Sequence, residues 1–462
     1  MWKNRMIRSC WLILFLWSSV AGHAQNGQLT INETALIDGS VSMTASGYNY
    51  NPGILALLPN IMVKGNGDLN PVSGTNSALP LSKFTAMYVR GANHDNAITL
   101  STTTAQSMTS ELLSLLLLSG GPFTVKYEAP GLSATAWKAG TYSNTLAFSL
   151  SAIGIGSAVT PTQATLTVTV DPLITASSAP GNMALVVNDL KYFRNTTLEI
   201  NNAFTLRHTV PVQLTLAANT AQLAFANGYS GVADPQTGVG KIQLQMTTPA
   251  GSILPLTTTS QQLVANAPVP VGNKTNFTTR FFISPSDLKT AFINKGDYST
   301  TLTLQGTNTS PAATYSKVLN LVVTVNDLSE FNLSATGVTL PFQTAADYKN
   351  GVALDLTNHL QVSKTTPYDI SVKAQTSDLT NGASGATVPV NILELGPVAG
   401  QSGVNTISAL STTDQLLVSG ALPAVDRYLN IRYRIPPSRT QYLINKPAGI
   451  YTAVINYTLT AH

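Results

Sequence analysis

Histidine residues are the first candidates for metal or acid–base chemistry in this chain. Outside the N-terminal segment they are His94, His208, His359 and His462. None stands at the HExxH or His-x-His spacing of a zinc site, and the single cysteine, Cys10, lies close to the N-terminus. His94 is followed by Asp95, but the neighbouring Gly and Asn residues are typical of a solvated turn. We therefore expect no metal site formed by histidine.

Catalysis by serine or by paired carboxylates is not indicated either. A serine hydrolase of the nucleophile-elbow type needs a G-x-S-x-G sequence, and the chain has none. A carboxylate pair of the glycosidase kind would have to be assembled from distant residues such as Glu33, Glu111, Glu128 and Glu199. The sequence predicts a protein that is not an enzyme and that has no cofactor.

Two further kinds of site stay open as alternatives. Calcium prefers oxygen-rich turns, and residues 66–68 (Asn-Gly-Asp) and 326–327 (Asn-Asp) are of that kind, although turn chemistry explains both. Aromatic pairs at 48–50 and 192–193 could form a sugar-binding face, although packing within a sandwich is the interpretation we favour. A carbohydrate-binding surface protein is therefore the second functional hypothesis.

The N-terminus predicts export. Three basic residues, an apolar core at 11–17 and a small-x-small pattern at 22–24 indicate a signal peptide over residues 1–24. The apolar core is too short to span a bilayer, and we find no later stretch of about 18 uncharged apolar residues. We expect a periplasmic, cell-surface or extracellular protein without a transmembrane segment. Because the attachment of such a chain would be non-covalent, its partners would be other surface proteins, further copies of itself or glycans.

Charge argues against nucleic acid as a partner. The chain has 25 basic and 21 acidic residues, and three of the basic ones lie in the predicted signal peptide. The largest basic group comprises Arg427, Arg432, Arg434 and Arg439. Arg432 and Arg434 alternate with apolar residues, as on the solvent face of a strand, so we predict no basic binding face.

A segment of glycine, tyrosine and an alternating strand occurs three times. Its positions are Gly140 and Tyr142, Gly296 and Tyr298, and Gly449 and Tyr451. The glycines are 156 and 153 residues apart. A Leu-(Ser/Thr)-Thr-Thr landmark begins at residues 100, 256 and 410, and opening strands occur near 29, 166 and 321. The recurrence predicts three related units, with the glycine and tyrosine as structural positions of the repeat.

The stretches between these landmarks predict strands. They are rich in Thr, Val, Leu and Tyr, alternate with period two, and are separated by Gly, Pro, Asn and Ser. We expect an all-β protein of three tandem immunoglobulin-like antiparallel sandwiches over 25–155, 163–308 and 316–462, joined by short linkers at 153–163 and 306–315. A short helical segment is expected at 285–292, capped by Ser286 or Asp287. Residues 110–118 are a second helical candidate, for which a buried strand is the alternative.

The repeated ending resembles the ends of two families of secreted proteins. The pattern Gly-x-Tyr-(Ser/Thr) with an alternating last strand, clearest at 448–460, is similar to spore coat protein U-type domains and to pilin subunits of the chaperone-usher route. The resemblance covers about the last 30 residues of each unit. It implies an immunoglobulin-like sandwich in a fibre or surface structure, and it brings no catalytic residues.

The chain departs from the pilin pattern in ways that bear on assembly. It joins three units, has no cysteine after the predicted signal peptide, and has only residues 25–28 before its first strand. Opening and last strands alternate, so we expect each unit to complete itself. In the alternative, residues 165–170 complete the first unit instead of opening the second. The leading hypothesis is a secreted structural or adhesive protein, for example a component of a fimbria-like or coat-like structure.

Overall fold

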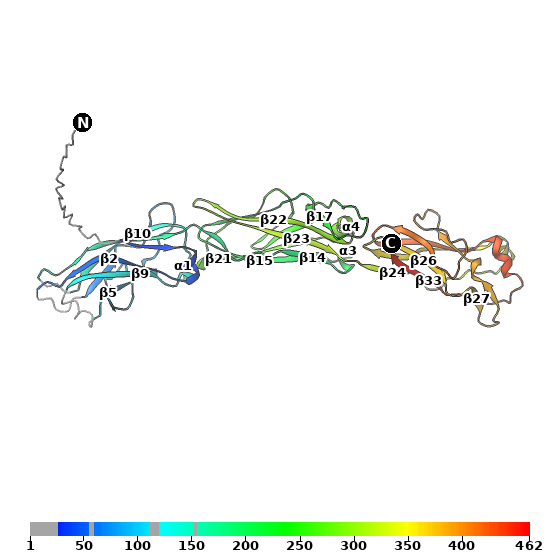
Figure 1. Ribbon diagram of the computed structural model, residues 1–462, viewed down its shortest axis with the longest axis horizontal. Helices are drawn as coiled ribbons and strands as arrows, with labels where there is room; N and C mark the ends of the chain where they lie inside the picture. Colours follow the sequence, from blue (N-terminus) through cyan, green and yellow to red (C-terminus); the bar gives the residue numbers. More distant parts are fainter. Residues whose placement is uncertain (1–25, 55–59, 111–119, 152–154) are drawn as a thin grey trace, which may run out of the picture.

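Three β-sandwiches follow one another along a rod in the computed structural model (Figure 1). The structure describes residues 26–54, 60–110, 120–151 and 155–462. Each sandwich surrounds its own cluster of buried apolar side chains. The prediction of an all-β protein built from sandwiches is therefore confirmed. The predicted signal peptide, and all of the helical candidate at 110–118 except its first residue, lie outside the described residues.

The first sandwich consists of two sheets of mostly antiparallel strands. One sheet has the order β1 (Gly27–Ile31), β12 (Gln163–Val170), β10 (Gly140–Leu150), β3 (Ile61–Gly65) and β8 (Gln106–Ser107), with β4 (Asn70–Pro71) also beside β10. The other has the order β11 (Ala158–Thr160), β2 (Val41–Asn51), β9 (Gly121–Ala129), β5 (Thr85–Arg90) and β6 (Asn93–His94), with β7 (Ile98–Thr99) also beside β5.

The second sandwich repeats this arrangement. One sheet has the order β13 (Ile174–Ser178), β15 (Leu198–His208), β21 (Lys274–Ile283), β18 (Gln243–Thr248) and β19 (Ala250–Pro255). The other has the order β14 (Met183–Val187), β23 (Ala312–Val325), β22 (Gly296–Thr309), β16 (Val212–Ala218) and β20 (Gln261–Ala267), with β17 (Ala224–Ala226) beside β22. In both sandwiches one pair is parallel, β1 with β12 and β14 with β23, within sheets that are otherwise antiparallel.

The third sandwich has fewer strands in its second sheet. The first sheet has the order β24 (Ser329–Leu333), β25 (Val352–Lys364), β31 (Ala424–Ile435) and β29 (Glu394–Pro397). The second contains only β30 (Gln415–Ala421), β26 (Tyr368–Ala374) and β33 (Ile455–Ala461). A small third sheet contains β28 (Thr387–Pro389), β27 (Asp378–Asn381) and β32 (Tyr451–Thr452).

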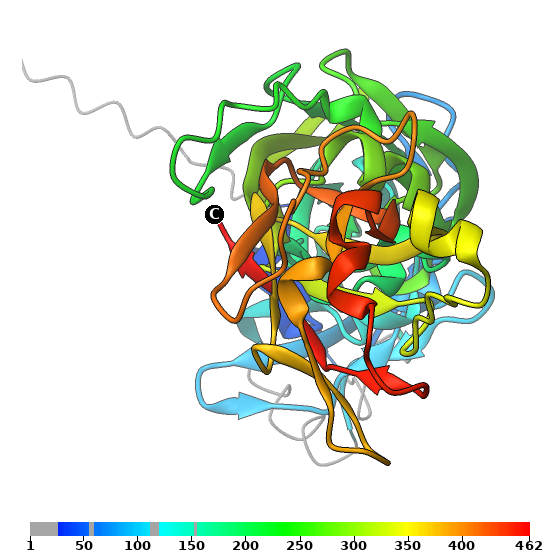
Figure 2. The same cartoon turned by 90° about the vertical axis from the view of Figure 1, so that its right-hand side faces the viewer.

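Helices are short and lie mainly where sandwiches meet or at the end of the rod (Figure 1). In the described part of the chain the α-helices are α1 (Glu33–Asp38), α3 (Lys191–Arg194), α4 (Pro285–Ala291) and α5 (Ala345–Asn350). The 3₁₀ helices are η1 (Leu81–Lys83), η3 (Leu132–Ala134), η4 (Val239–Lys241), η5 (Val271–Asn273), η6 (Val390–Ile392) and η7 (Pro437–Leu443). The helix expected at 285–292 is confirmed, but its cap is Ser284, whose hydroxyl accepts from the Asp287 N–H. In Figure 2, which looks along the rod, α5 (yellow) and η7 (red) face the viewer at the free end of the third sandwich.

The opening strands expected for the second and third units belong instead to the preceding sandwiches. β12 pairs with β10 of the first sandwich, and β23 pairs with β22 of the second. The alternative in which residues 165–170 complete the first unit is therefore the arrangement found. The stretches expected as linkers are also structured: β11 lies within 153–163, and 306–315 is the hairpin between β22 and β23. Alternation predicts which face of a strand is buried, but not which neighbour the strand pairs with.

Candidate functional site

The repeated glycine and tyrosine have the same local structure in all three sandwiches. Gly140, Gly296 and Gly449 have φ of 147°, 147° and 145°, a region that L-residues avoid. Two residues later, each tyrosine hydroxyl donates to the carbonyl oxygen four positions before it, at 2.8, 3.0 and 2.8 Å. The turn and the tyrosine therefore set the start of the strand that follows, which is β10, β22 or the segment from β32 to β33.

In the first two sandwiches, the inner face of this strand is covered. β12 places its alternate apolar residues Ala164, Leu166, Val168 and Val170 in the core, and all four are buried. β23 does the same with Leu319, Leu321, Val323 and Val325. Beside them, on β10 and β22, Tyr142 and Tyr298 are 1% and 0% exposed, and Leu146 and Leu302 are both 0% exposed. The added strand thus completes both the sheet and the core.

The third sandwich has the strand but no neighbour for its outer edge. β33 pairs with β26 on one side, and no strand in the described part of the chain pairs with its other side. Its inward row, Tyr451, Ala453, Ile455, Tyr457 and Leu459, is only half-buried, although it packs against the third core. At the positions equivalent to Tyr451, Ile455 and Tyr457, both completed sandwiches have buried residues. The row on β33 is therefore apolar but lacks a neighbouring strand.

The segment that would flank such a cover is also unpaired. Residues 27–31 and 183–187 form β1 and β14, which pair in parallel with β12 and β23. In the third sandwich the corresponding segment is residues 338–342. It ends ten residues before the start of β25, and β1 likewise ends ten residues before the start of β2. Val338, Leu340 and Phe342 are half-buried there, and the segment is not in a strand. We use the term open edge for β33 with its inward row and residues 338–342.

The base of the open edge is held in place by a buried polar chain across the sandwich. His359 Nε2, on β25, lies 2.8 Å from the hydroxyl of Tyr433 on β31, which is hydrogen-bonded to the hydroxyl of Tyr457 on β33. Burial lowers the pKa of His359 and raises the pKa of Tyr433 to about 12. These groups are therefore uncharged at neutral pH. Such satisfied bonds fix the position of β33 relative to the opposite sheet.

Main-chain hydrogen bonding is the chemistry that the open edge offers. The outward N–H and C=O groups of an edge strand can pair with an added strand, while the row of side chains selects the residues opposite it. The register in the completed sandwiches defines these positions: Val170 and Val325 lie opposite the glycine, and Val168 and Val323 lie opposite the tyrosine. Leu166 and Leu321 lie opposite the residue four positions after the glycine, and Ala164 and Leu319 lie opposite the residue six positions after it.

Histidines and aromatic residues considered from the sequence serve mainly structural roles. The imidazole of His208 is buried between the Val210 carbonyl and the Thr275 hydroxyl, at 2.7 and 2.8 Å, and burial lowers its pKa. His462 Nδ1 lies 3.2 Å from Asp369. His94 is exposed on β6. Among the described residues no three His, Cys, Asp or Glu side chains come together as a metal site would require.

The aromatic pairs proposed for sugar binding are largely buried. Tyr48 and Tyr50 are each 1% exposed, and Phe193 is 0% exposed. Tyr192 packs against the second core, with the Lys191 ammonium 5.2 Å from its ring centroid. The packing interpretation of these residues is therefore the one that the structure supports.

The turns considered for calcium have partners within the protein. Asp68 Oδ1 accepts from the Leu81 N–H at 2.9 Å. Asp327 Oδ1 lies 2.8 Å from the ammonium of Lys364, and the carbonyl of Asn326 accepts from the Thr365 hydroxyl. These contacts account for the polar residues in both turns.

The basic residues near the C-terminal part of the chain belong to strand surfaces, as expected. Arg432 pairs with Asp355 at 2.6 Å, and Arg434 pairs with Glu394 at 2.6 Å. Between and beside them Ile431, Tyr433 and Ile435 point into the core. The positive charges are thus neutralised along the sheet.

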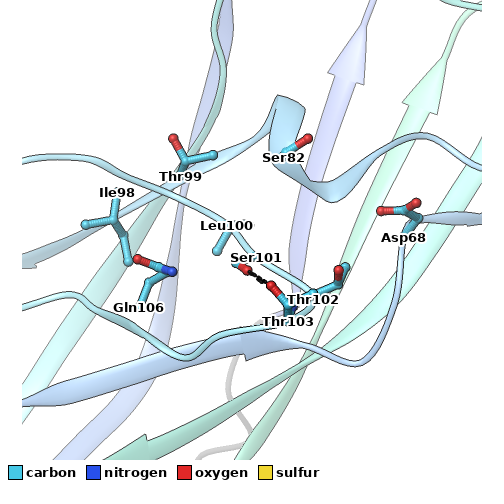
Figure 3. Close-up of a pocket in the computed structure, with 9 residues that line it drawn as sticks. All are labelled: Asp68, Ser82, Ile98, Thr99, Leu100, Ser101, Thr102, Thr103 and Gln106. Carbon is cyan, nitrogen blue, oxygen red and sulfur yellow. Dashed lines mark hydrogen bonds between the residues drawn. The ribbon is translucent and has the colours of Figure 1, made fainter.

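A pocket on the first sandwich is a second candidate, shown in Figure 3. Its lining residues are Asp68, Ser82, Ile98, Thr99, Leu100, Ser101, Thr102, Thr103 and Gln106. The Ser101 hydroxyl lies 3.2 Å from that of Thr103, so these polar groups bond to one another (Figure 3). The same loop anchors every sandwich: the carbonyls of Ser101, Thr257 and Ser411 accept from the N–H groups of Gly65, Ala218 and Ala374. We therefore assign this loop a structural role.

No family model matches the sequence, and no curated protein matches it. Solved structures with a similar arrangement include a chaperone–tip adhesion subunit complex of archaic Csu pili from Acinetobacter baumannii, with 9% identity, a TM-score of 0.31, and coverage of 62% of this chain and 99% of that chain. The adhesive subunit of CFA/I fimbria of enterotoxigenic Escherichia coli has 11% identity, a TM-score of 0.26, and coverage of 65% and 98%. A tip adhesin from Pseudomonas aeruginosa has 11% identity, a TM-score of 0.25, and coverage of 62% and 90%.

No helix in the described ranges is long and apolar enough to cross a membrane.

Proposed function

We propose that the open edge of the third sandwich receives a β-strand from another protein, and that the chain is a structural or adhesive component of a surface assembly. The observation that carries the proposal is the contrast between equivalent residues. Leu146 and Leu302 are fully buried on strands that pair with β12 and β23, whereas Ile455, on a strand without such a neighbour, is half-buried. A strand from another protein supplies the cover that the first two sandwiches take from this chain.

The partner strand has a defined pattern. From its N-terminal end, its inward-facing residues are Ala or Leu, then Leu, Val and Val, as in β12 and β23. One outward-facing residue separates each of them from the next. The last valine lies opposite Gly449. It runs antiparallel to β33 and parallel to residues 338–342, because β12 and β23 run in this way between their neighbours.

Energetics favour occupation of the open edge. Full burial of a Val or Leu side chain contributes about 1.5 to 3 kcal/mol, and an added strand would bury four of them together with the half-buried row. A long apolar edge left free is also a site of uncontrolled association. The third sandwich is therefore suited to a bound state, and a protein that delivers the strand would stabilise it.

This function needs no catalytic group and suits an exported chain. Three sandwiches in a row give a long body, and the open edge runs along the third of them (Figure 1). We propose that the units are best divided at 171–173 and 326–328, the segments that follow β12 and β23. The first sandwich is then the part farthest from the partner, where an adhesive protein would present its binding surface.

An extended chain tests the proposal. Thirteen positions separate Gly296 from Thr309 and Gly449 from His462, so residues 310–326 can be repeated directly after His462 in the register of the β22–β23 hairpin. We expect this extension to slow amide exchange in β33 and to raise the melting temperature of the third sandwich. A shift of about 2 to 4 °C per kcal/mol is typical of domains of this size.

The matched control carries Leu321→Asp in the repeated strand only. A carboxylate at this core-facing position prevents insertion, because an unpaired buried charge is strongly unfavourable. The control should melt and exchange like the parent chain. If β33 of the parent is already protected to the same extent as β22, or if both extended chains behave alike, the proposal is wrong.

A further inference from the structure

One threonine makes several of the hydrogen bonds at the connection between the first and second sandwiches. Thr209 directly follows β15. Its hydroxyl donates to the carbonyl of Asp171 at 2.6 Å and accepts from the N–H of Leu173 at 3.0 Å. Its backbone carbonyl accepts from the N–H of Ala139, in the first sandwich, at 2.8 Å. The threonine thus fixes both the segment that leaves β12 and the residue that precedes Gly140.

The connection between the second and third sandwiches has the same arrangement. Thr365 directly follows β25. Its hydroxyl donates to the carbonyl of Asn326 and accepts from the N–H of Leu328, both at 2.8 Å. Its carbonyl accepts from the N–H of Lys295, which precedes Gly296, at 2.8 Å. Two joints 156 residues apart therefore use one set of contacts, which we call the threonine clasp.

Ion pairs add to the second joint. Arg194 on α3 reaches Glu330 and Asp426 of the third sandwich at 2.7 and 2.8 Å, and Lys289 reaches Asp426 at 3.4 Å. Burial by itself raises the pKa of Asp426, but the hydrogen bond and charge of Arg194 outweigh burial, and the pKa is lowered. Cations on the preceding sandwich thus face carboxylates on the following one.

The end of the third sandwich that faces away from the second has the N–H donor of the threonine clasp but no threonine to accept from it. Ala448 precedes Gly449, as Ala139 and Lys295 precede their glycines, and it is exposed. Its N–H has no acceptor among the described residues. Around it Tyr442, Ile444 and Ile450 are 46%, 56% and 79% exposed. Lys349 on α5, near the place that Arg194 has on α3, is also exposed.

The opposite end of the rod, in the first sandwich, has no threonine at the position that Thr209 and Thr365 have in the other two. Residues 52–54, which follow β2 where Thr209 follows β15, contain no threonine. A second copy of this chain therefore cannot form the clasp through its first sandwich. The occupant of the free end must be a different protein.

We propose that the free end, defined by Ala448, Tyr442, Ile444, Ile450 and Lys349, docks a sandwich of another protein that has a threonine after its counterpart of β15 and β25. This rests on the proposed function. A strand on the open edge would reach Gly449 at its last apolar residue, as β12 and β23 reach Gly140 and Gly296, and would deliver the next sandwich to this end. The facing surface of that sandwich carries carboxylates opposite Lys349.

A chain with a fourth sandwich tests the docking. Residues 310–462 are repeated after His462, which supplies both the strand and a sandwich with its own copy of Thr365. Gln305 on β22 and Thr458 on β33 are exposed and lie nine residues after their glycines. Spin labels at Gln305→Cys and Thr458→Cys measure the existing joint, and labels at both copies of Thr458→Cys measure the new one.

We expect the two distance distributions to agree in mean and width. With Thr365→Val in the repeated part only, the narrow distribution should be lost, because the hydroxyl that holds the connecting segment is gone. Two broad distributions across the new joint, with and without this substitution, would overturn the docking.

Amide exchange in β33 separates failure of docking from failure of the proposed function. If β33 is protected in the chain with the fourth sandwich while the new joint is flexible, the strand binds as proposed but the docking proposal is wrong. If β33 exchanges as in the parent chain, strand binding itself is wrong. An acidic-to-neutral change at the repeated Glu330 and Asp426 should widen the distribution less than Thr365→Val.

Discussion

A pair of alanine substitutions at equivalent positions can measure how far the third sandwich is left uncovered. Leu302 on β22 and Ile455 on β33 each lie six residues after their glycine. Leu302 is 0% exposed beside β23, and Ile455 is half-buried at the open edge. Both substitutions remove a branched aliphatic side chain of similar size, so the difference between them reports the missing strand.

The magnitudes follow from burial. Leu→Ala at a fully buried position lowers the free energy of unfolding by about 3 kcal/mol, through lost transfer energy and the cavity that remains. At Ile455 only part of the side-chain surface is in water, so the expected loss is smaller, about 2 kcal/mol. Since 1.4 kcal/mol corresponds to a factor of ten, opening should become about 100-fold more frequent in the second sandwich and about 30-fold in the third.

Amide hydrogen exchange followed by mass spectrometry can resolve the two sandwiches in one chain. β16 is central in the second sandwich and β26 in the third, so their amides report the opening of each. Leu146→Ala, at the same position in the first sandwich and also 0% exposed, is the internal control for a covered strand.

The reasoning would be refuted if Ile455→Ala accelerated exchange in β26 as strongly as Leu302→Ala does in β16. That result would mean that the inward row of β33 is already covered in the isolated protein. With residues 310–326 repeated after His462, the effect of Ile455→Ala should instead rise to that of Leu302→Ala.

Three further predictions concern single positions. Gly449→Val should lower the stability of the third sandwich by about 1 to 3 kcal/mol, because φ at this position is 145°; an unchanged thermal melt would contradict it. His359 has a pKa below that of an exposed histidine, so the unfolded state gains its proton first as the pH falls below about 6.5. The third sandwich should therefore lose stability from pH 7 to pH 5 in urea titrations, and His359→Gln should flatten that dependence. The pKa of Asp426 is lowered, so its pairing with Arg194 stabilises the second joint at neutral pH and is lost as the pH falls below about 4. Asp426→Asn should loosen the joint at neutral pH, seen by X-ray scattering as a broader range of molecular lengths, and a parent chain that stays equally stiff at pH 3 would argue against this role.

The polar residues of the joints were the functional positions that sequence reasoning missed. Thr209 and Thr365 stand in equivalent places, but threonine is common throughout the chain, and its role depends on partners 36 to 39 residues away and across the joint. Thr209 and Thr365 are 156 residues apart, as Gly140 and Gly296 are, and this shared spacing could have identified them from the sequence. Asp426 and Arg194 are separated by 232 residues, and no local pattern connects them.

The sequence by itself determined the kind of structure and the places where it recurs. Period-two alternation predicted strands, and the spacing of Gly140, Gly296 and Gly449 predicted equivalent turns, because a backbone with φ near 145° requires glycine whatever surrounds it. These are properties of a few consecutive residues. They are the same in all three sandwiches, including the one that is open.

Only the tertiary structure decided which strand completes which sandwich. β12 and β23 have the composition of opening strands, and they do lead into the next sandwich, but they pair with the one before. Each apolar face would be buried equally well on either side of the joint, since alternation carries no information about the pairing partner. The absence of a third such strand from the described residues, and the half-buried row on β33, follow from pairing between segments far apart in the chain.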